Sequence, residues 1–321
     1  MSESTEEPSL SCSRRWVTLA LIGASLGFNI AALSLPFMHL RQGISKEPYS
    51  LVNSVILMWE KGLFVLVVLV VGFSILFPFA KLAVLAWVAL SKKVGKPELK
   101  WLHVVELMGK WSMLDAFLVS IILALASNQF FVDGTPLIGL NCFILAILLS
   151  MVTGEVLSRS LHQPERELDG PSEDQSVIWL VLSGLALLGA LSIPFLSIQD
   201  WILKNREYSI LSLGPVLFAE GAWLAAALVF CFLIIAPMLS WAASFYSWRN
   251  GRKGIPYEKT RYWIQLAQRW NMLDVFGLSL VVFALESDQL MKTEIRWGAL
   301  FLGGALALQV AFNTLLRRTL R

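Results

Sequence analysis

A short motif with a single carboxylate occurs twice in the chain. Residues 110–117 read KWSMLDAF and residues 269–276 read RWNMLDVF, so each copy puts an aspartate, Asp115 or Asp274, at the start of an apolar run. Ionisable groups at membrane depth cost roughly 2.5–3.5 kcal/mol on insertion scales and tend to face a bundle interior or a water-filled cavity. One chemistry open to such a residue is a buried carboxylate whose protonation or ion pairing can change.

A lysine within an apolar run is the candidate partner of the first aspartate. Lys81 follows Pro78 by three residues, at a point where a proline breaks the helical ladder and frees a carbonyl. A Lys81–Asp115 ion pair is the simplest account of the first copy. The second copy has Ser240 in place of Lys81, so Asp274 lacks that partner. The alternative is that both aspartates are helix N-caps or interfacial groups that orient a short helix.

The other motif residues are candidates to line a lipid path, and two prolines are candidate helix kinks. The tryptophans are favoured as interfacial anchors over stacking platforms, and the methionines as packing residues by default. The path candidates are Trp111, Ser112, Met113, Trp270, Asn271 and Met272, and the kinks are Pro78 and Pro237.

The elements that carry these residues are apolar runs. Of the 321 residues, 56% are hydrophobic and only 15% are charged, and the mean hydropathy is +0.66. Runs of 18 or more apolar residues can cross a bilayer core as helices, so the sequence predicts an all-α polytopic membrane protein. The expected spans are 16–38, 62–90, 112–127, 136–158, 177–198, 221–247, 271–286 and 295–316. The spans that begin at the two motifs are short, so the preceding segments are expected to help complete the crossings.

The distribution of lysine and arginine predicts the orientation of the spans. With the N-terminus in the cytoplasm, 18 of the 26 basic residues fall in cytoplasmic segments and 7 in outside loops. Cytoplasmic loops carry the excess of basic residues, so both termini are expected in the cytoplasm. The basic residues are scattered over loops, and no nucleic-acid-binding module is recognisable.

The chain contains an internal repeat. A shift of 159 residues aligns Met113-Leu114-Asp115 with Met272-Leu273-Asp274, and Pro78 with Pro237. A unit with an even number of spans keeps its orientation when duplicated, so these are parallel repeats. The expected divisions are a cytoplasmic tail (1–15), a first four-helix unit (16–161), a cytoplasmic linker (162–176) and a second four-helix unit (177–318).

Two further segments carry structural expectations. Residues 98–110 have polar and apolar residues at helical spacing and a tryptophan, which predicts a helix lying at the cytoplasmic membrane surface. The outside loops that contain Tyr49-Ser50 and Tyr208-Ser209 are expected to form short strands that hold a partner.

No cofactor, metal or enzymatic activity is expected. The three cysteines, Cys12, Cys142 and Cys231, form no CxxC pair and have no metal-ligand spacing. The P-loop, GxSxG and HExxH signatures are missing, which argues against an ATPase or a hydrolase.

The repeated motif and the upstream P-x-x-K at Pro78–Lys81 resemble the paraquat-inducible protein A family. The resemblance covers about 16–161 and 177–318. It implies tetraspanin-like four-helix units in the inner membrane of a Gram-negative bacterium. It also implies work with MCE proteins, which form hydrophobic tunnels across the periplasm, and passage of phospholipid to or from such a tunnel. Larger members carry zinc ribbons with CxxC pairs before each unit; this chain has no such pairs, so no zinc is expected.

The residues are compatible with three functions. The favoured one is the lipid-transport subunit, which needs a lateral opening and a polar niche for a headgroup. The second is a proton- or ion-coupled carrier for a small solute that acts alone, with Lys81 and Asp115 as the coupling pair. The third is a membrane scaffold that anchors a periplasmic partner.

Overall fold

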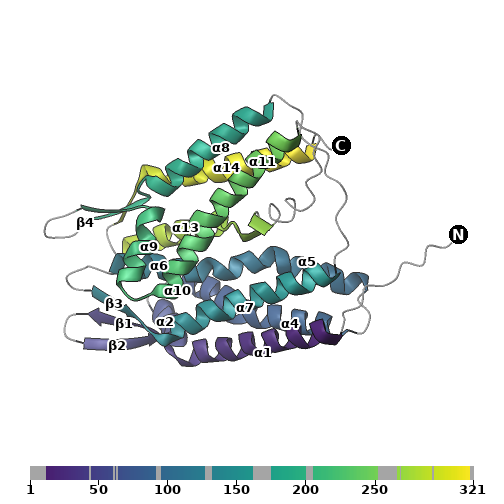
Figure 1. The fold of residues 1–321 in the computed structure, drawn as a ribbon. Coiled ribbons are helices and arrows are strands. Elements are labelled where there is room, and N and C mark those ends of the chain that lie inside the picture. The colour runs from purple at the N-terminus through teal and green to yellow at the C-terminus, as the bar shows by residue number, and fades with distance from the viewer. Residues whose placement is uncertain are drawn as a thin grey trace. The chain divides into compact units, whose positions relative to one another are not determined.

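The chain folds into helices with two small sheets (Figure 1). The computed structural model describes residues 12–42, 45–60, 62, 64–91, 95–126, 132–161, 175–199, 205–251, 266–267, 269–290 and 293–318. Most of the predicted linker (162–176) and most of the predicted cytoplasmic tail (1–15) lie outside these residues.

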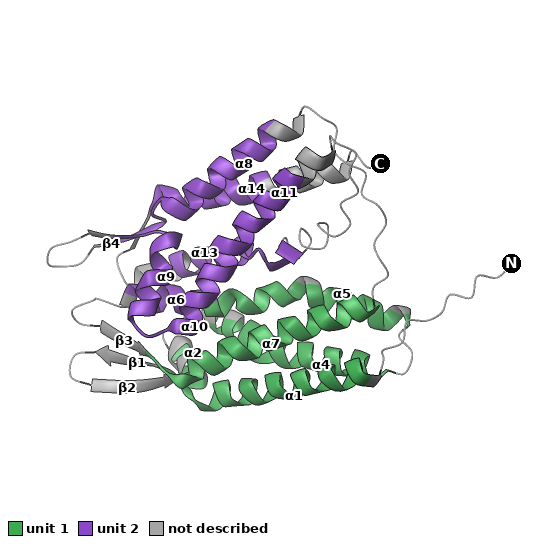
Figure 2. Cartoon of the chain, viewed as in Figure 1, with its two compact units in different colours: residues 1–116, 130–165 green, residues 117–129, 166–321 purple. Residues whose placement is uncertain are grey.

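Two compact units are distinguished in Figure 2. Unit 1 comprises residues 1–116 and 130–165, and unit 2 comprises residues 117–129 and 166–321. Residues 117–129 therefore belong with unit 2 although they come from the first half of the sequence. The domain ranges expected from the repeat stay a prediction.

Unit 1 contains most of the N-terminal elements. They are α1 (Cys12–Ser34), β1 (Pro36–Gln42), β2 (Ser45–Ser50), α2 (Leu51–Glu60), α3 (Phe64–Leu69), the π-helical turn η1 (Val70–Leu76), α4 (Phe77–Leu90), α5 (Lys96–Gly109), the 3-10 turn η2 (Lys110–Met113), the start of α6 (Leu114–Ala126), β3 (Val132–Pro136) and α7 (Ile138–Leu161).

Unit 2 contains the rest of α6 and the C-terminal elements. They are α8 (Gln175–Ser192), β4 (Leu196–Gln199), β5 (Asn205–Tyr208), α9 (Ile210–Ala219), α10 (Trp223–Val229), the π-helical turn η3 (Phe230–Ile235), α11 (Ala236–Gly251), α13 (Leu273–Leu290), β6 (Thr293–Ile295) and α14 (Trp297–Arg318).

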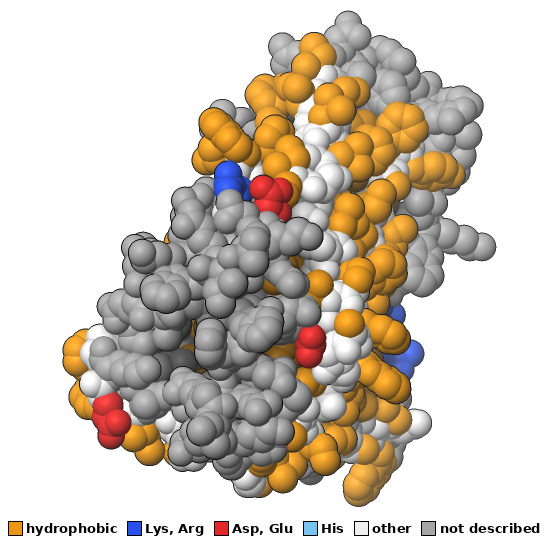
Figure 3. All heavy atoms as spheres, turned by 90° about the vertical axis from the view of Figure 1, so that its left-hand side faces the viewer, with side chains coloured by type: hydrophobic (Ala, Val, Ile, Leu, Met, Phe, Trp, Pro, Cys, Tyr) orange, Lys and Arg blue, Asp and Glu red, His pale blue; other side chains and the backbone are white. Residues whose placement is uncertain are grey.

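Several helices are long and apolar enough to cross a membrane. Within the described residues there are five of them: Ser13–Ser34, Val70–Leu90, Pro97–Leu125, Ile138–Leu161 and Trp223–Tyr246. Shorter apolar helices cover Ile178–Ser192, Ile210–Ala219, Leu273–Ala284 and Trp297–Leu308. Hydrophobic side chains also spread over much of the described surface in Figure 3. The chain is a multi-pass membrane protein of mainly helical class.

Unit 1 is built around a bundle of α1, α4, α5 and α7, which lie side by side in Figure 1. Its core includes Ile22 of α1, Leu85 of α4, Leu102 of α5 and Leu157 of α7. One face of α5 packs on α4 and α7, and the membrane-surface location expected for residues 98–110 stays a prediction. The helical run continues through η2 into α6, so the preceding segment does lengthen the short span, as expected.

The strands form one three-stranded antiparallel sheet in each unit. The order is β2-β1-β3 in unit 1 and β5-β4-β6 in unit 2. Tyr49 and Ser50 lie in β2, and Tyr208 ends β5. Ser209 follows as the N-cap of α9 and accepts a hydrogen bond from the Ser212 N–H at 3.3 Å. The expectation of short strands in these loops is confirmed.

Two pairs of glycines that lie 159 residues apart share a backbone conformation or a close backbone contact in the two units. Gly62 and Gly221 have φ of 78° and 79°, which only glycine adopts without strain. Gly139 of α7 lies against the backbone oxygens of the turn before β1, and Gly298 of α14 lies against those of the turn before β4. A Cβ at either of these two positions would overlap a backbone carbonyl, so a larger residue cannot replace them without movement.

Candidate functional site

The buried ammonium of Lys81 lies within the unit 1 bundle. The residue is 3% exposed, and its Nζ donates a hydrogen bond to Ser150 Oγ of α7 at 3.1 Å. Ser150 in turn donates to the Ile147 carbonyl at 2.8 Å, so its hydroxyl is oriented to accept from the lysine. A charge at membrane depth is costly unless polar groups face it, and the Ser150 hydroxyl is one such group.

Gly109, the last residue of α5, makes room for this ammonium. A Cβ built at Gly109 would lie 3.4 Å from Lys81 Nζ and 3.8 Å from its Cε. The lysine head therefore lies against the point where α5 ends and η2 begins.

The carboxyl group of Asp115 is buried without a hydrogen-bond partner among the described residues. It lies in the first turn of α6, is 4% exposed, and neither oxygen is bonded to any residue that the structure describes. The expected direct pair with Lys81 is therefore not formed, because the ammonium is directed to Ser150. The N-cap interpretation of Asp115 is also wrong, since a cap must accept a backbone N–H.

An irregular turn separates Lys81 from Asp115 along the fold. The Ser112 hydroxyl donates to the Gly109 carbonyl at 2.8 Å within η2, and α6 begins directly after this 3-10 turn. The turn contacts η1, the π-helical turn that precedes α4. Both irregular segments of unit 1 thus meet beside the two ionisable residues. Interrupted helices are where membrane transporters commonly bind ions and substrates.

The two candidate kink prolines each follow a π-helical turn. Pro78 lies just after η1, and Pro237 lies just after η3. A proline cannot donate to the carbonyl four residues earlier and its ring crowds that carbonyl. A wider π turn relieves this crowding, and such turns are frequent at functional sites. The helix kink expected at each proline stays a prediction.

The second copy of the motif is built differently. Asn271 Oδ1 accepts from the Leu273 N–H at 3.2 Å, so the asparagine caps α13. Asp274 is the second residue of α13 and is half-buried. Ser240, at the position of Lys81, is buried.

The remaining motif residues are packing and contact groups. Met113 and Met272 are fully buried, and Trp111 and Trp270 are half-buried. The Trp270 ring stacks on Phe232 of η3, with centroids 5.4 Å apart and planes 15° apart. In each unit, therefore, the motif region contacts the π-helical turn. Interfacial anchoring by the tryptophans stays a prediction.

Sequence reasoning did not identify Ser150 or Gly109. A serine within the apolar run 138–161 was the available signal for the first. The second could not be found, because its role depends on a contact between α4 and α5. No group of three or more His, Cys, Asp or Glu residues that could hold a metal occurs within the described part of the chain.

Comparison with known proteins identifies relatives. The family model of "Paraquat-inducible protein A" matches residues 16–163 and again residues 174–320. "Intermembrane transport protein PqiA" of Escherichia coli strain K12 is 31% identical over 163 residues, which is 48% of this chain and 39% of that protein. The protein of the same name from Shigella flexneri matches equally. The alignment thus spans well under half of these relatives. No solved structure matches the chain.

Proposed function

The chain belongs to the paraquat-inducible protein A family, and we propose that it is the membrane subunit of an intermembrane phospholipid transport system. In this role it passes lipid between the bacterial inner membrane and a periplasmic tunnel protein with MCE domains, and it is a transporter component, not an enzyme. The observation that carries the proposal is the family match over both halves of the chain. The printed name of the relatives, intermembrane transport protein, supports it.

The proposed architecture is two tandem parallel units of four transmembrane helices, with both termini in the cytoplasm. Two observations support it. The family model matches twice, and the two sheets have the same strand order. The excess of lysine and arginine in one set of loops supports the orientation. With this orientation the sheets face the periplasm, where the tunnel protein would dock.

The proposed transport site lies in unit 1. Lys81, Ser150 and Asp115 supply a cation, a hydroxyl and an unpartnered carboxyl group beside η1 and η2. A phospholipid headgroup that leaves the membrane plane needs polar groups to replace its water. Movement at the irregular turns would let the ammonium exchange Ser150 for Asp115 or for a headgroup phosphate. Asp274 is the corresponding carboxyl of unit 2, in a site without an ammonium at Ser240.

Site-specific photocrosslinking in cells tests the partner and the orientation together. One probe replaces Glu207, an exposed residue of β5, and a control probe replaces Lys100, an exposed residue of α5. We expect the first probe, but not the second, to capture an MCE-domain protein. Capture by neither, together with solute flux through proteoliposomes of the chain alone, would replace this proposal with the solute carrier.

The scaffold alternative requires a second readout. A scaffold also captures the partner, but it does not move lipid. Phospholipid delivery to the captured tunnel protein, lost in Lys81→Met while capture persists, separates transport from anchoring. Capture of the tunnel protein with no phospholipid delivery by the parent chain would favour the scaffold.

A further inference from the structure

Three arginines gather at one end of unit 1, away from the Lys81 site. Arg14 and Arg15 lie in the first turn of α1, and Arg159 lies in the last turn of α7. The two helices pack along their lengths. Arg14 Nη1 donates to Ser160 Oγ at 3.5 Å, which holds its guanidinium at the end of α7.

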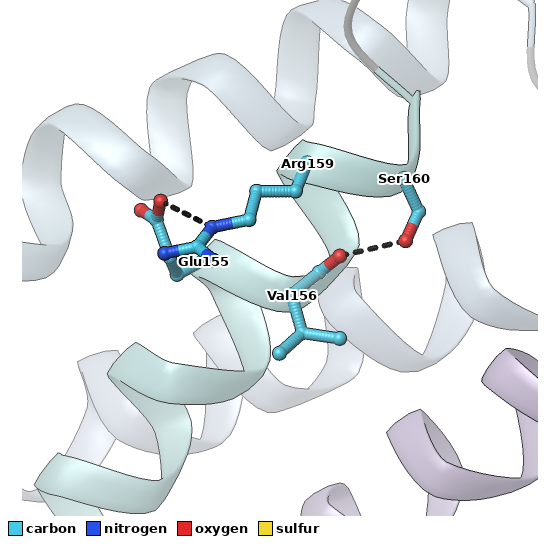
Figure 4. A network of polar contacts seen from close by, with 4 residues as sticks. All are labelled: Glu155, Val156, Arg159 and Ser160. Atoms are coloured by element: carbon cyan, nitrogen blue, oxygen red, sulfur yellow. Dashed lines mark hydrogen bonds and ion pairs between the residues drawn. The ribbon is translucent and has the colours of Figure 1, made fainter. Parts of the chain in front are cut away.

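The polar contacts at the end of α7 leave this cluster basic. Arg159 Nε donates to Glu155 Oε1 at 3.0 Å, and Ser160 Oγ donates to the Val156 carbonyl at 2.8 Å (Figure 4). Glu155 offsets one of the three positive charges. The Arg159 side chain remains 48% exposed, whereas that of Glu155 is 16% exposed. The cation is thus the partner that faces the surroundings.

Apolar and aromatic surface lies next to these charges. Trp16 follows Arg15 directly and is 70% exposed, and Trp87 near the end of α4 is also exposed. Arg15 donates to the carbonyl of Leu90, the last residue of α4, which links the two helix ends. Exposed tryptophans at the ends of membrane helices mark the headgroup level of the bilayer.

We propose that this end of unit 1 binds the phosphodiester of an anionic phospholipid from the adjacent leaflet. Guanidinium groups bind phosphate oxygens with paired hydrogen bonds, and Arg14 and Arg159 come from two helices that one headgroup can bridge. The indole of Trp16 and the neighbouring apolar side chains then contact the acyl chains. An anionic headgroup is favoured over a zwitterionic one because it brings no ammonium into a basic cluster. This lipid is held at the site and is separate from the lipid proposed to be transported.

The test uses the purified full-length chain and native mass spectrometry. Phosphatidylglycerol and phosphatidylcholine of identical acyl chains are added at equal concentrations, and thermal stability is followed in parallel. We expect phosphatidylglycerol to be retained and to raise the melting temperature, with phosphatidylcholine retained less. Inorganic phosphate at the same concentration should have no effect, because it lacks the acyl chains.

Matched variants assign the effect to the cluster. Arg14→Gln removes one exposed guanidinium, and Glu155→Gln with Arg159→Gln removes the ion pair as a unit. Each should weaken phosphatidylglycerol binding about tenfold, the loss of one charge-assisted contact. Arg269→Gln, at an exposed arginine of unit 2, is the control and should leave binding unchanged. Equal retention of the two lipids, or a loss in the control equal to that in Arg14→Gln, would overturn the proposal. Stabilisation by inorganic phosphate alone would do so as well.

Discussion

Unit 1 buries an ammonium where unit 2 buries a hydroxyl. Lys81 and Ser240 occupy the same place in the repeat, each three residues after a proline that follows a π-helical turn. Both are only 3% exposed. The proline and the π-helical turn recur in both units, whereas the buried polar group differs. A shared scaffold therefore carries two different polar chemistries.

The repeat-equivalents of two residues that contact Lys81 also differ in type. The shift of 159 residues pairs Gly109 with Gln268, and Ser150 with Gln309. Where the repeat has the long lysine, the facing residue of α5 is a glycine; where it has the short serine, the corresponding residue is a glutamine. The proposed function therefore places the charge-dependent step of lipid transport in unit 1, the unit that has the lysine.

Replacing the buried ammonium should give the largest effect. Lys81→Met removes a costly buried charge, so the protein should fold normally while phospholipid delivery falls by about tenfold or more, equivalent to at least ~1.4 kcal/mol in the barrier. Ser240→Ala should leave delivery within about twofold. Delivery to a tunnel protein and melting temperature are measured together. Equal losses in the two variants would remove the functional difference between the units.

Adding a methyl group at the tight glycines should destabilise both units alike. Gly139→Ala and Gly298→Ala each force a Cβ onto a backbone carbonyl. Overpacking of this kind lowers the free energy of unfolding by about 1–3 kcal/mol, and we expect a similar loss from each variant. Thermal or denaturant unfolding in detergent measures the change. A large loss in one variant and none in the other would show that the scaffold is not shared at these turns.

A paired substitution tests whether the side chains at positions 81 and 109 share the same space. Gly109→Gln should destabilise unit 1 by about 1–3 kcal/mol, because its side chain enters the space of the Lys81 head. Adding Lys81→Ser recreates the combination found in unit 2 and should recover about 1 kcal/mol or more of that loss. A double-mutant cycle on unfolding free energies gives the coupling. Strict additivity would mean that the two positions do not share space.

Removing the carboxyl group of Asp115 should stabilise the protein and lower phospholipid delivery. Asp115→Leu eliminates two buried oxygens that lack partners, a gain of about 1 kcal/mol or more. Asp274→Leu should be neutral or destabilising, since that side chain is only half-buried. Melting temperatures and phospholipid delivery are compared for both variants. A destabilised Asp115→Leu would indicate that its carboxyl group is satisfied in the native membrane.

The turn glycines should give the smallest and most nearly equal effects. Gly62→Ala and Gly221→Ala place an alanine at φ near +78° and +79°, a strain of about 1 kcal/mol each. Neither Cβ would meet a neighbour within 4 Å, so packing adds nothing. The free energies of unfolding of the two single variants, each compared with the parent, measure this strain. Shifts that differ severalfold would show that the two turns are not equivalent.

The helical class and the paired motifs could be predicted from the sequence, because apolar run length and recurrence are local properties. The strands around Tyr49 and Tyr208 could also be predicted. The packing of Leu102 and Val105 in a core shared with α4 and α7 could not be predicted from residues 98–110, because it is not a local property.

The residues of the candidate site could be predicted from the sequence, but their contacts could not. Lys81 and Asp115 stand out as charges within apolar runs, and simple electrostatics pairs them. In the fold, the ammonium instead donates to Ser150, and the carboxyl oxygens of Asp115 have no partner in the part of the chain that the structure describes. Which of several polar groups a flexible lysine reaches depends on the positions of three helices. That information is distributed over α4, α5 and α7.

Phospholipid delivery in a reconstituted system tests the central claim most directly. Proteoliposomes carry the chain and a fluorescent phospholipid, purified MCE-domain tunnel protein is added outside, and transfer of the label to that protein is followed over time. The account predicts transfer by the parent chain and by Ser240→Ala, and a rate lower by about tenfold or more for Lys81→Met. No transfer by the parent, or the same rate for all three proteins, would contradict it.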